Sequence, residues 1–142
     1  MIEYPRLNAD NLNLGFEEFF QTFSGLFQGD DQKACYLMGV LCSKVLDIQW
    51  HLHQGRQPFF RHLKGLNLDE AKIHELLWRL KSKLVEYERD YYGGLERAIA
   101  ERFRLARSPW RMPSSEISFF FTLGMCEAQL FDFTPTTKED PS

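Results

Sequence analysis

The chain has 142 residues, 44% hydrophobic and 26% charged, a balance typical of one globular domain, which excludes an intrinsically disordered chain. Its formal net charge of −3 does not suggest a dedicated nucleic-acid binder, but the charge is unevenly distributed. Residues 56–111 hold 13 Lys and Arg against 8 Asp and Glu, a net charge of +5, whereas the other residues hold 4 against 12, a net charge of −8.

The first third of the chain predicts two helices after an irregular lead-in over residues 1–13. Asn13 is expected to cap the first helix, and Gly29 to end it. Its Phe residues recur at helical spacing; they are Phe16, Phe19, Phe20, Phe23 and Phe27. Asp30 then predicts the N-cap of a helix over 31–54, which Gly55 ends. Because this helix is apolar almost all round, it should be central in a bundle.

The rest of the chain predicts three more helices. A short segment that opens at Pro58 precedes a helix over 70–92, which Asp69 is expected to cap. Gly93-Gly94 predicts a tight turn before a helix over 95–107. In the last element, 116–131, a strand competes with a helix, and the length of the apolar run favours the helix.

Together these elements predict an all-α fold, a compact bundle of about five helices joined by short loops. We expect residues 1–133 to form a single helical-bundle domain. Residues 134–142 lack the apolar side chains that a core needs and are expected to form a disordered tail.

The three cysteines, Cys35, Cys42 and Cys126, are widely spaced and form no CxxC motif, so we expect reduced thiols. Reduced thiols are typical of a reducing compartment. The N-terminus shows no signal-peptide pattern, and no apolar stretch is long and clean enough to span a bilayer. These features predict a cytoplasmic protein that does not contact membranes.

No catalytic constellation is recognisable in the sequence. The nucleotide-binding, nucleophile-elbow and zinc-protease motifs do not occur. His51 and His53 would point about 200° apart on a helix, so they should not share a metal ion. Cys126 has no neighbouring His in the sequence that could activate it. We therefore expect no catalytic residue, no metal and no cofactor, and do not expect an enzyme.

Basic residues recur at helical spacing in the two helices of the basic central region. The first stripe consists of Lys72, Arg79 and Lys83, and the second of Arg97, Arg104, Arg107 and Arg111. Such stripes suit contacts to a phosphate backbone, and Arg can bind phosphate through two hydrogen bonds. The alternative is an ordinary solvated face with interspersed Glu residues. Because no aromatic ladder beyond Tyr91, Tyr92 and Trp110 accompanies the stripes, base-specific readout is not expected.

Phe119, Phe120 and Phe121 are consecutive, so on a helix they point in three directions. One bundle core rarely takes all three. At least one of them is expected to face another surface, and the triplet is therefore a candidate partner interface.

Four segments in a characteristic order resemble a known family: YLMGVLCSKVLDIQ at 36–49, RQPFFRHLKGLNL at 56–68, LLWRLKSKLVEYERDYYGG at 76–94 and EISFFFTLGM at 116–125. Over residues 30–131 the chain resembles the C-terminal helical portion of the large subunit of type I-B CRISPR Cascade complexes. That family also produces this portion as a separate small subunit.

The resemblance implies a non-catalytic subunit, present in more than one copy, that lines the belly of an RNA-guided antiviral complex. It would help to hold the target DNA strands of the R-loop through backbone contacts. The implied partners are the CRISPR backbone and large subunits, guide RNA, target DNA and further copies of the chain. The nuclease and helicase activities would belong to a separate recruited protein.

Two other functions stay open on the residues alone. The chain could be a helical interaction or adaptor module of another assembly, which associates through its Phe surfaces and has no nucleic-acid role. A small metal- or thiol-dependent enzyme is the other alternative.

Overall fold

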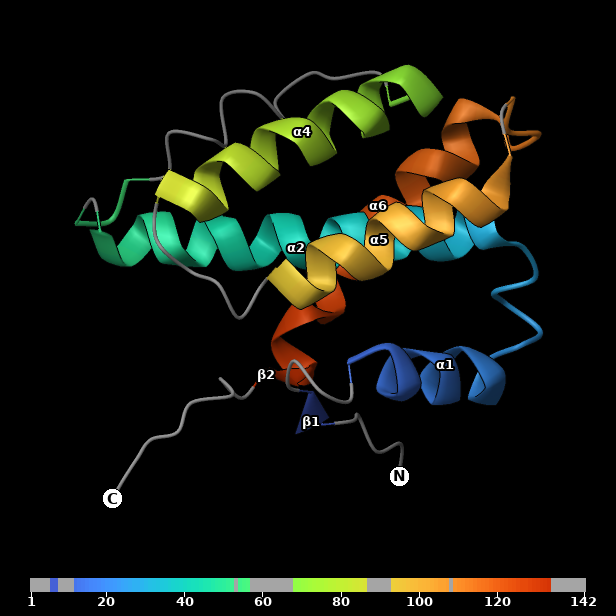
Figure 1. The fold of residues 1–142 in the computed structure, drawn as a ribbon, viewed down its shortest axis with the longest axis horizontal. Helices are drawn as coiled ribbons and strands as arrows, with labels where there is room; N and C mark the ends of the chain where they lie inside the picture. Colours follow the sequence, from blue (N-terminus) through green and yellow to red (C-terminus); the bar gives the residue numbers. More distant parts are fainter. Residues whose placement is uncertain are drawn as a thin grey trace.

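A computed structural model of the chain describes residues 6–7, 12–52, 54–56, 68–86, 93–107 and 109–133. Its α-helices are α1 (Leu12–Thr22), α2 (Asp30–Leu52), α4 (Glu70–Glu86), α5 (Gly93–Ala106) and α6 (Ser114–Glu127). A 3-10 helix, η2 (Ala128–Leu130), follows α6, and a short strand β1 (Arg6–Leu7) pairs in parallel with β2 (Asp132–Phe133). The predicted all-α bundle of about five helices is confirmed (Figure 1).

Helix α2 is the axis of the bundle, as its apolar sequence predicts. Its residues are buried around most of the helix between Ala34 and Gln49, and α4, α5 and α6 all pack against it. In Figure 1, α4 lies above α2, α5 passes in front of it and α6 crosses behind it. Helices α4 and α5, which carry the basic stripes, are therefore both positioned by packing against α2.

Helices α2 and α6 cross so closely that two glycines contact the opposite backbone. A Cβ added to Gly39 of α2 would lie 2.0 Å from the carbonyl oxygen of Phe121. A Cβ added to Gly124 of α6 would lie 2.0 Å from the carbonyl oxygen of Tyr36. Only residues without a Cβ allow this approach, so the two glycines fix where α6 lies.

An aromatic cluster attaches α1 to the rest of the bundle. It joins Phe residues of α1 and the following turn to one Tyr of α2 and one Phe after α6; its members are Phe16, Phe19, Phe20, Phe27, Tyr36 and Phe131. The Tyr36 hydroxyl also donates a hydrogen bond to Glu127 Oε1 at 2.6 Å. Since all six are buried, this Phe-rich segment is core and not a free partner surface.

Some helix ends differ from the prediction. Helix α1 ends at Thr22 and not at Gly29, because residues 23–26 form a turn that Phe27 N–H closes on the Phe23 carbonyl at 3.0 Å. Asp30 is the first residue of α2 rather than its cap, and the Gln32 side chain accepts hydrogen bonds from the preceding backbone. Local side-chain hydrogen bonds of this kind compete with the patterns that predict helix ends.

Further differences concern elements between and around the helices. Gly93 and Gly94 begin α5 instead of forming a turn before it, and β1 lies within the segment expected to be irregular. The Asp69 cap is confirmed, since Lys72 N–H donates to Asp69 Oδ1 at 2.8 Å. The last element is helical as expected, but its α-helix runs over Ser114–Glu127 instead of 116–131 and gives way to the 3-10 helix after Glu127. The segment that opens at Pro58, the predicted end of α4 over 87–92 and the tail over 134–142 lie outside the described residues.

Candidate nucleic-acid interface

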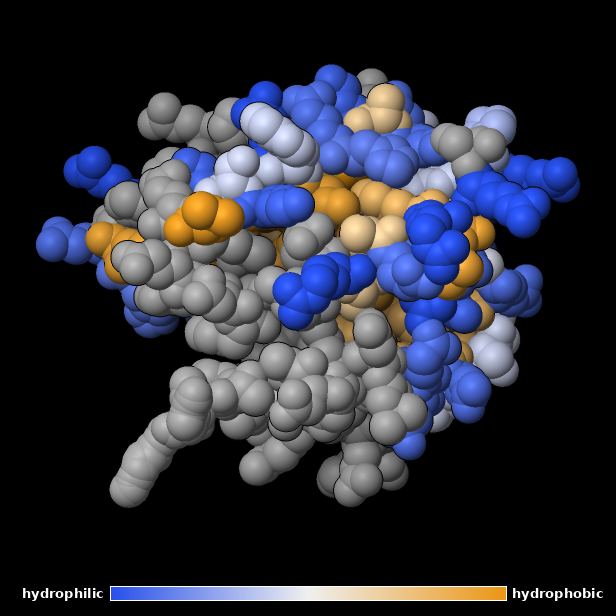
Figure 2. All heavy atoms as spheres, viewed as in Figure 1, coloured by the Kyte–Doolittle hydropathy of each residue, from blue (hydrophilic) through white to orange (hydrophobic). Residues whose placement is uncertain are grey.

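The helices that carry the two basic stripes lie next to each other on α2. The His74 ring of α4 is 4.3 Å from the Phe103 ring of α5, measured between centroids. Beyond α5, the backbone N–H of Trp110 donates a hydrogen bond of 2.7 Å to Glu70 Oε1 at the start of α4. In Figure 2, hydrophilic side chains lie over much of α4, whereas over α5 they alternate with hydrophobic ones. The packing thus brings the two predicted stripes onto neighbouring helices.

Ion pairs within single helices neutralise part of these stripes. Arg79 Nη2 lies 3.1 Å from Glu75 Oε2, four residues earlier in the same helix, and Lys72 Nζ lies 4.0 Å from the same carboxylate. Arg104 pairs with Glu101, and the hydrogen bond from Arg104 lowers the pKa of the Glu101 carboxyl. These three cations share two local carboxylates and therefore have less charge to offer a ligand.

Three of the predicted arginines remain available. Arg97, Arg107 and Arg111 are exposed, and no ion pair engages them within the described ranges. Lys83 is half-buried in the last turn of α4 and already interacts with another group of the chain. Among the residues of the two predicted stripes, the unengaged positive charge therefore belongs to the arginines of α5 and of the segment that follows it.

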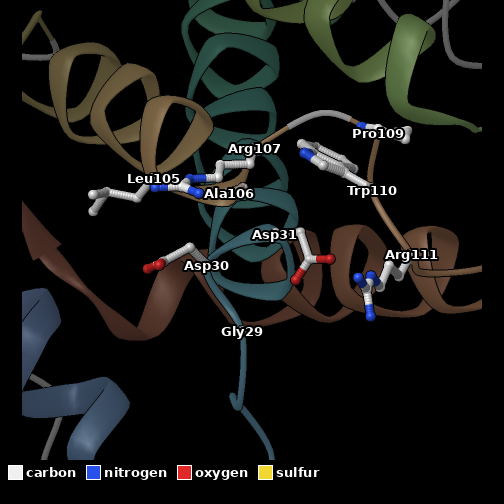
Figure 3. A pocket seen from close by; sticks show the side chains of 9 residues that line it. All are labelled: Gly29, Asp30, Asp31, Leu105, Ala106, Arg107, Pro109, Trp110 and Arg111. Atoms are coloured by element: carbon white, nitrogen blue, oxygen red, sulfur yellow. The ribbon is translucent and has the colours of Figure 1, made fainter.

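Two of these arginines line a single pocket at the end of α5. It has a volume of about 480 Å³ and also takes in Trp110 and the start of α2 with Asp30 and Asp31. Figure 3 shows Arg107 and Arg111 on two sides of this pocket. Arg107 does not continue the stripe along α5 as predicted, because it lies one residue past the helix with a left-handed backbone, φ 51°.

The two carboxylates of this pocket have partners elsewhere. Asp30 Oδ1 accepts a hydrogen bond from Arg102 Nη1 at 3.0 Å, and Asp31 Oδ1 accepts one from Gln32 N–H at 2.8 Å. Neither forms a salt bridge to Arg107 or Arg111 among the described residues. The pocket therefore holds an indole ring and two guanidinium groups that form no ion pair among the described residues, but also two carboxylates, so only its guanidinium groups suit a phosphate-bearing ligand.

The Phe triplet separates into one surface residue and two core residues. Phe119 is 52% exposed, whereas Phe120 and Phe121 are 4% and 5% exposed and pack in the core. Of the three candidate interface residues, only Phe119 is therefore on the surface, where it lines an apolar groove of about 410 Å³. The groove follows one side of α6 and is formed by Ser118, Phe119, Thr122, Leu123 and Cys126.

The described residues offer few groups for catalysis. Burial raises the pKa of the Cys42 thiol to about 12 and raises that of Cys35 further, so both thiols are protonated near neutral pH. Cys126 is exposed in the groove of α6. Across the described ranges, no three His, Cys, Asp or Glu side chains come together as metal ligands, and no helix combines the length and apolar character needed to cross a membrane.

Arg102 is a charged residue of α5 whose role the sequence does not reveal. It pairs with Asp30 of α2 and with Glu17 of α1, so it joins three helices instead of lying in the exposed stripe. The sequence gives one indication that Arg102 differs from its neighbours: on a helix it does not share the face of Arg97 and Arg104. Its partners are distant in the chain and cannot be inferred from spacing.

One comparison with known proteins gives a match. A family model described as the CRISPR-associated protein TM1802 (cas_TM1802) C-terminal domain matches residues 3–139. No curated protein and no solved structure gives a significant match. The family match spans all the described helices and both basic stripes.

Proposed function

Since the chain belongs to the family of the CRISPR-associated protein TM1802 C-terminal domain, we propose that it is a non-catalytic small subunit of a type I CRISPR RNA-guided complex, which helps to hold the target DNA of the R-loop. The observation that carries this proposal is the set of exposed, unengaged arginines: Arg97, Arg107 and Arg111. Guanidinium groups without a protein carboxylate are the groups best able to bind phosphate.

The contacts in this proposal are to the backbone of the nucleic acid and not to specific bases. Binding of this kind is weak for one subunit, because a few phosphate contacts give little affinity at physiological salt. Several copies in one complex would raise the effective concentration of these contacts. We therefore place the function in an assembly with the CRISPR backbone and large subunits, guide RNA and further copies of this chain, and assign no reaction to the chain itself.

Charge removal at the pocket tests the contacts. We expect Arg107→Gln with Arg111→Gln to weaken DNA retention by the assembled complex, because two phosphate contacts are lost. The slope of log K against log salt should fall by about 0.7–0.9 for each contact. The measurement is the dissociation constant for target DNA over a series of salt concentrations.

A matched control removes the same charge from paired residues. Arg79→Gln with Arg104→Gln lowers the net charge equally, but both arginines already bind a neighbouring Glu. This variant should change the salt slope much less. An equal effect of the two double variants would contradict the assignment of the contacts to Arg107 and Arg111.

Assembly is tested separately by native mass spectrometry of the chain co-expressed with type I-B backbone and large subunits and guide RNA. A particle that contains two or more copies of the chain supports the proposal. A complete particle that forms while the chain stays free contradicts it.

The exposed Phe119 supports a second candidate function, a helical adaptor module without a nucleic-acid role. Its groove on α6 is apolar and open to solvent. We expect Phe119→Ser to reduce association with partner subunits in co-purification while changing stability by less than about 0.5 kcal/mol, since surface substitutions rarely do more. Leu26→Ser is the matched control, because Leu26 is also exposed but lies in the turn after α1. Equal association of both variants would remove the support for the groove.

A further inference from the structure

The outer face of α4 exposes large apolar side chains that the described structure does not cover. Trp78 is 70% exposed and Val85 is 72% exposed, the highest fractions among the large hydrophobic residues described. Trp78 lies on the side of α4 away from the buried residues Ile73, Leu76 and Leu80. A Trp side chain that supports no core packing is available to contact a ligand.

The charge around Trp78 is positive. Between Lys72 and Val85, α4 has four cationic residues and a single carboxylate, that of Glu75. Glu75 is occupied by Arg79 and Lys72. Lys81 lies three residues after Trp78, is exposed and has no ion pair within the part of the chain that the structure describes. An aromatic face and a free ammonium group thus lie side by side on one surface.

A ligand that matches both features must offer aromatic faces and negative charge in close alternation. Single-stranded nucleic acid does so, since each nucleotide carries one base and one phosphate. A duplex does not, because its bases are already stacked on each other. An apolar partner helix fits less well, because the polar residues Lys81 and Ser82 separate Trp78 from Val85.

We propose that Trp78 is a stacking platform for one base of a single strand, and that Lys81 contacts an adjacent phosphate of that strand. This inference rests on the proposed function, since the strand would be one that is unpaired in the R-loop. Stacking on an indole is tolerant of sequence, which agrees with the absence of base-specific readout expected for this surface. It makes α4 the part of the molecule that distinguishes single strands from duplex.

The test compares single-stranded and duplex binding by the full chain at low salt. The probes are a fluorescently labelled oligothymidylate and a labelled DNA hairpin of matched length. Trp78→Ala should weaken oligothymidylate binding about 5- to 150-fold, as expected from ~1–3 kcal/mol per stacked base, and leave hairpin binding unchanged. Trp78→Phe should restore most of the loss. Trp50→Ala is the control, because Trp50 is also exposed but lies near the end of α2.

The outcomes separate this inference from the proposed function. If Trp78→Ala has no effect, or weakens both probes equally, stacking is overturned, and a loss in the Arg107→Gln with Arg111→Gln variant would leave the proposed function standing. If neither variant binds differently from the wild-type chain, both fail. A Trp78→Ala variant that binds DNA normally but leaves the assembled complex would identify α4 as a protein-docking face. A wild-type chain that binds no oligothymidylate at low salt would also overturn the inference.

Discussion

Replacing Gly39 by Ala should lower the free energy of unfolding by about 3 kcal/mol or more, near the upper end of what overpacking usually costs. The new Cβ would lie 2.0 Å from the Phe121 carbonyl oxygen and 2.8 Å from the Met125 nitrogen. Both are backbone atoms of α6, so no side chain can rotate to relieve the clash. The helices must move apart, which would also loosen the packing of the buried residues between them. Chemical denaturation followed by circular dichroism measures the change.

Gly25→Ala is the matched control for Gly39→Ala. An added Cβ at Gly25 meets no atom within 4 Å, so it introduces no clash. The same substitution should leave stability unchanged or raise it by about 0.4–1 kcal/mol, since Ala restricts the unfolded chain more than Gly does. If Gly39→Ala were as stable as Gly25→Ala, the close crossing of α2 and α6 would be wrong.

The close crossing of α2 and α6 at Gly39 and Gly124 is a part of the fold that could not be predicted from the sequence. The Asp69 cap and the apolar periodicity of α2 are local signals, and both predict what the structure has. The contact of each glycine with the opposite backbone depends on how two helices distant in the sequence cross. From the sequence alone, a glycine inside a helical pattern indicates only a lower helix propensity. Its role in packing becomes clear only when the helix that it contacts is known.

The candidate site was predictable in the same partial way. Helical spacing groups Lys72 with Arg79 and Arg97 with Arg104, but it does not say which cations keep a free charge. The Glu75–Arg79 pair follows from the spacing rule, and the Glu101–Arg104 pair obeys the same rule. The position of Arg107 does not follow from the spacing rule. Arg107 lies after the end of α5 and itself has a left-handed backbone, which takes it out of the stripe.

The exposure of Trp78 lay within reach of the sequence. It sits on the polar side of the helical pattern over 70–92, where an aromatic residue is out of place. An exposed Trp on a polar helix face is a stronger pointer to function than a cationic stripe, because solvated charges need no explanation whereas a solvated indole does.

The second large effect on stability is expected for Arg102, whose ion pairs join α1, α2 and α5. Arg102→Met should lower the free energy of unfolding by about 2 kcal/mol, a value below the 3–5 kcal/mol found for fully buried pairs. The Arg102 side chain is only 12% exposed, but its partners Glu17 and Asp30 are 42% and 32% exposed and keep part of their hydration. The Arg102 guanidinium also lies over the Phe20 ring, 5.7 Å from its centroid, so the loss includes this cation–π contact as well as the two ion pairs. The buried aromatic cluster still attaches α1, so the expected result is a lower denaturation midpoint of the whole chain, measured by chemical denaturation followed by circular dichroism.

Arg104→Met provides the comparison within the same helix. It deletes the same group two residues away, but among the described residues Arg104 pairs with Glu101 alone, on the solvated side of α5. That variant should unfold almost like the wild-type chain, because exposed pairs within one helix contribute little. A double-mutant cycle of Arg102→Met with Asp30→Asn then isolates the α5–α2 link, and a coupling energy near zero would refute it. A positive coupling would mean that Arg102 holds α5 to α2, a structural role that separates it from the exposed arginines of the same region.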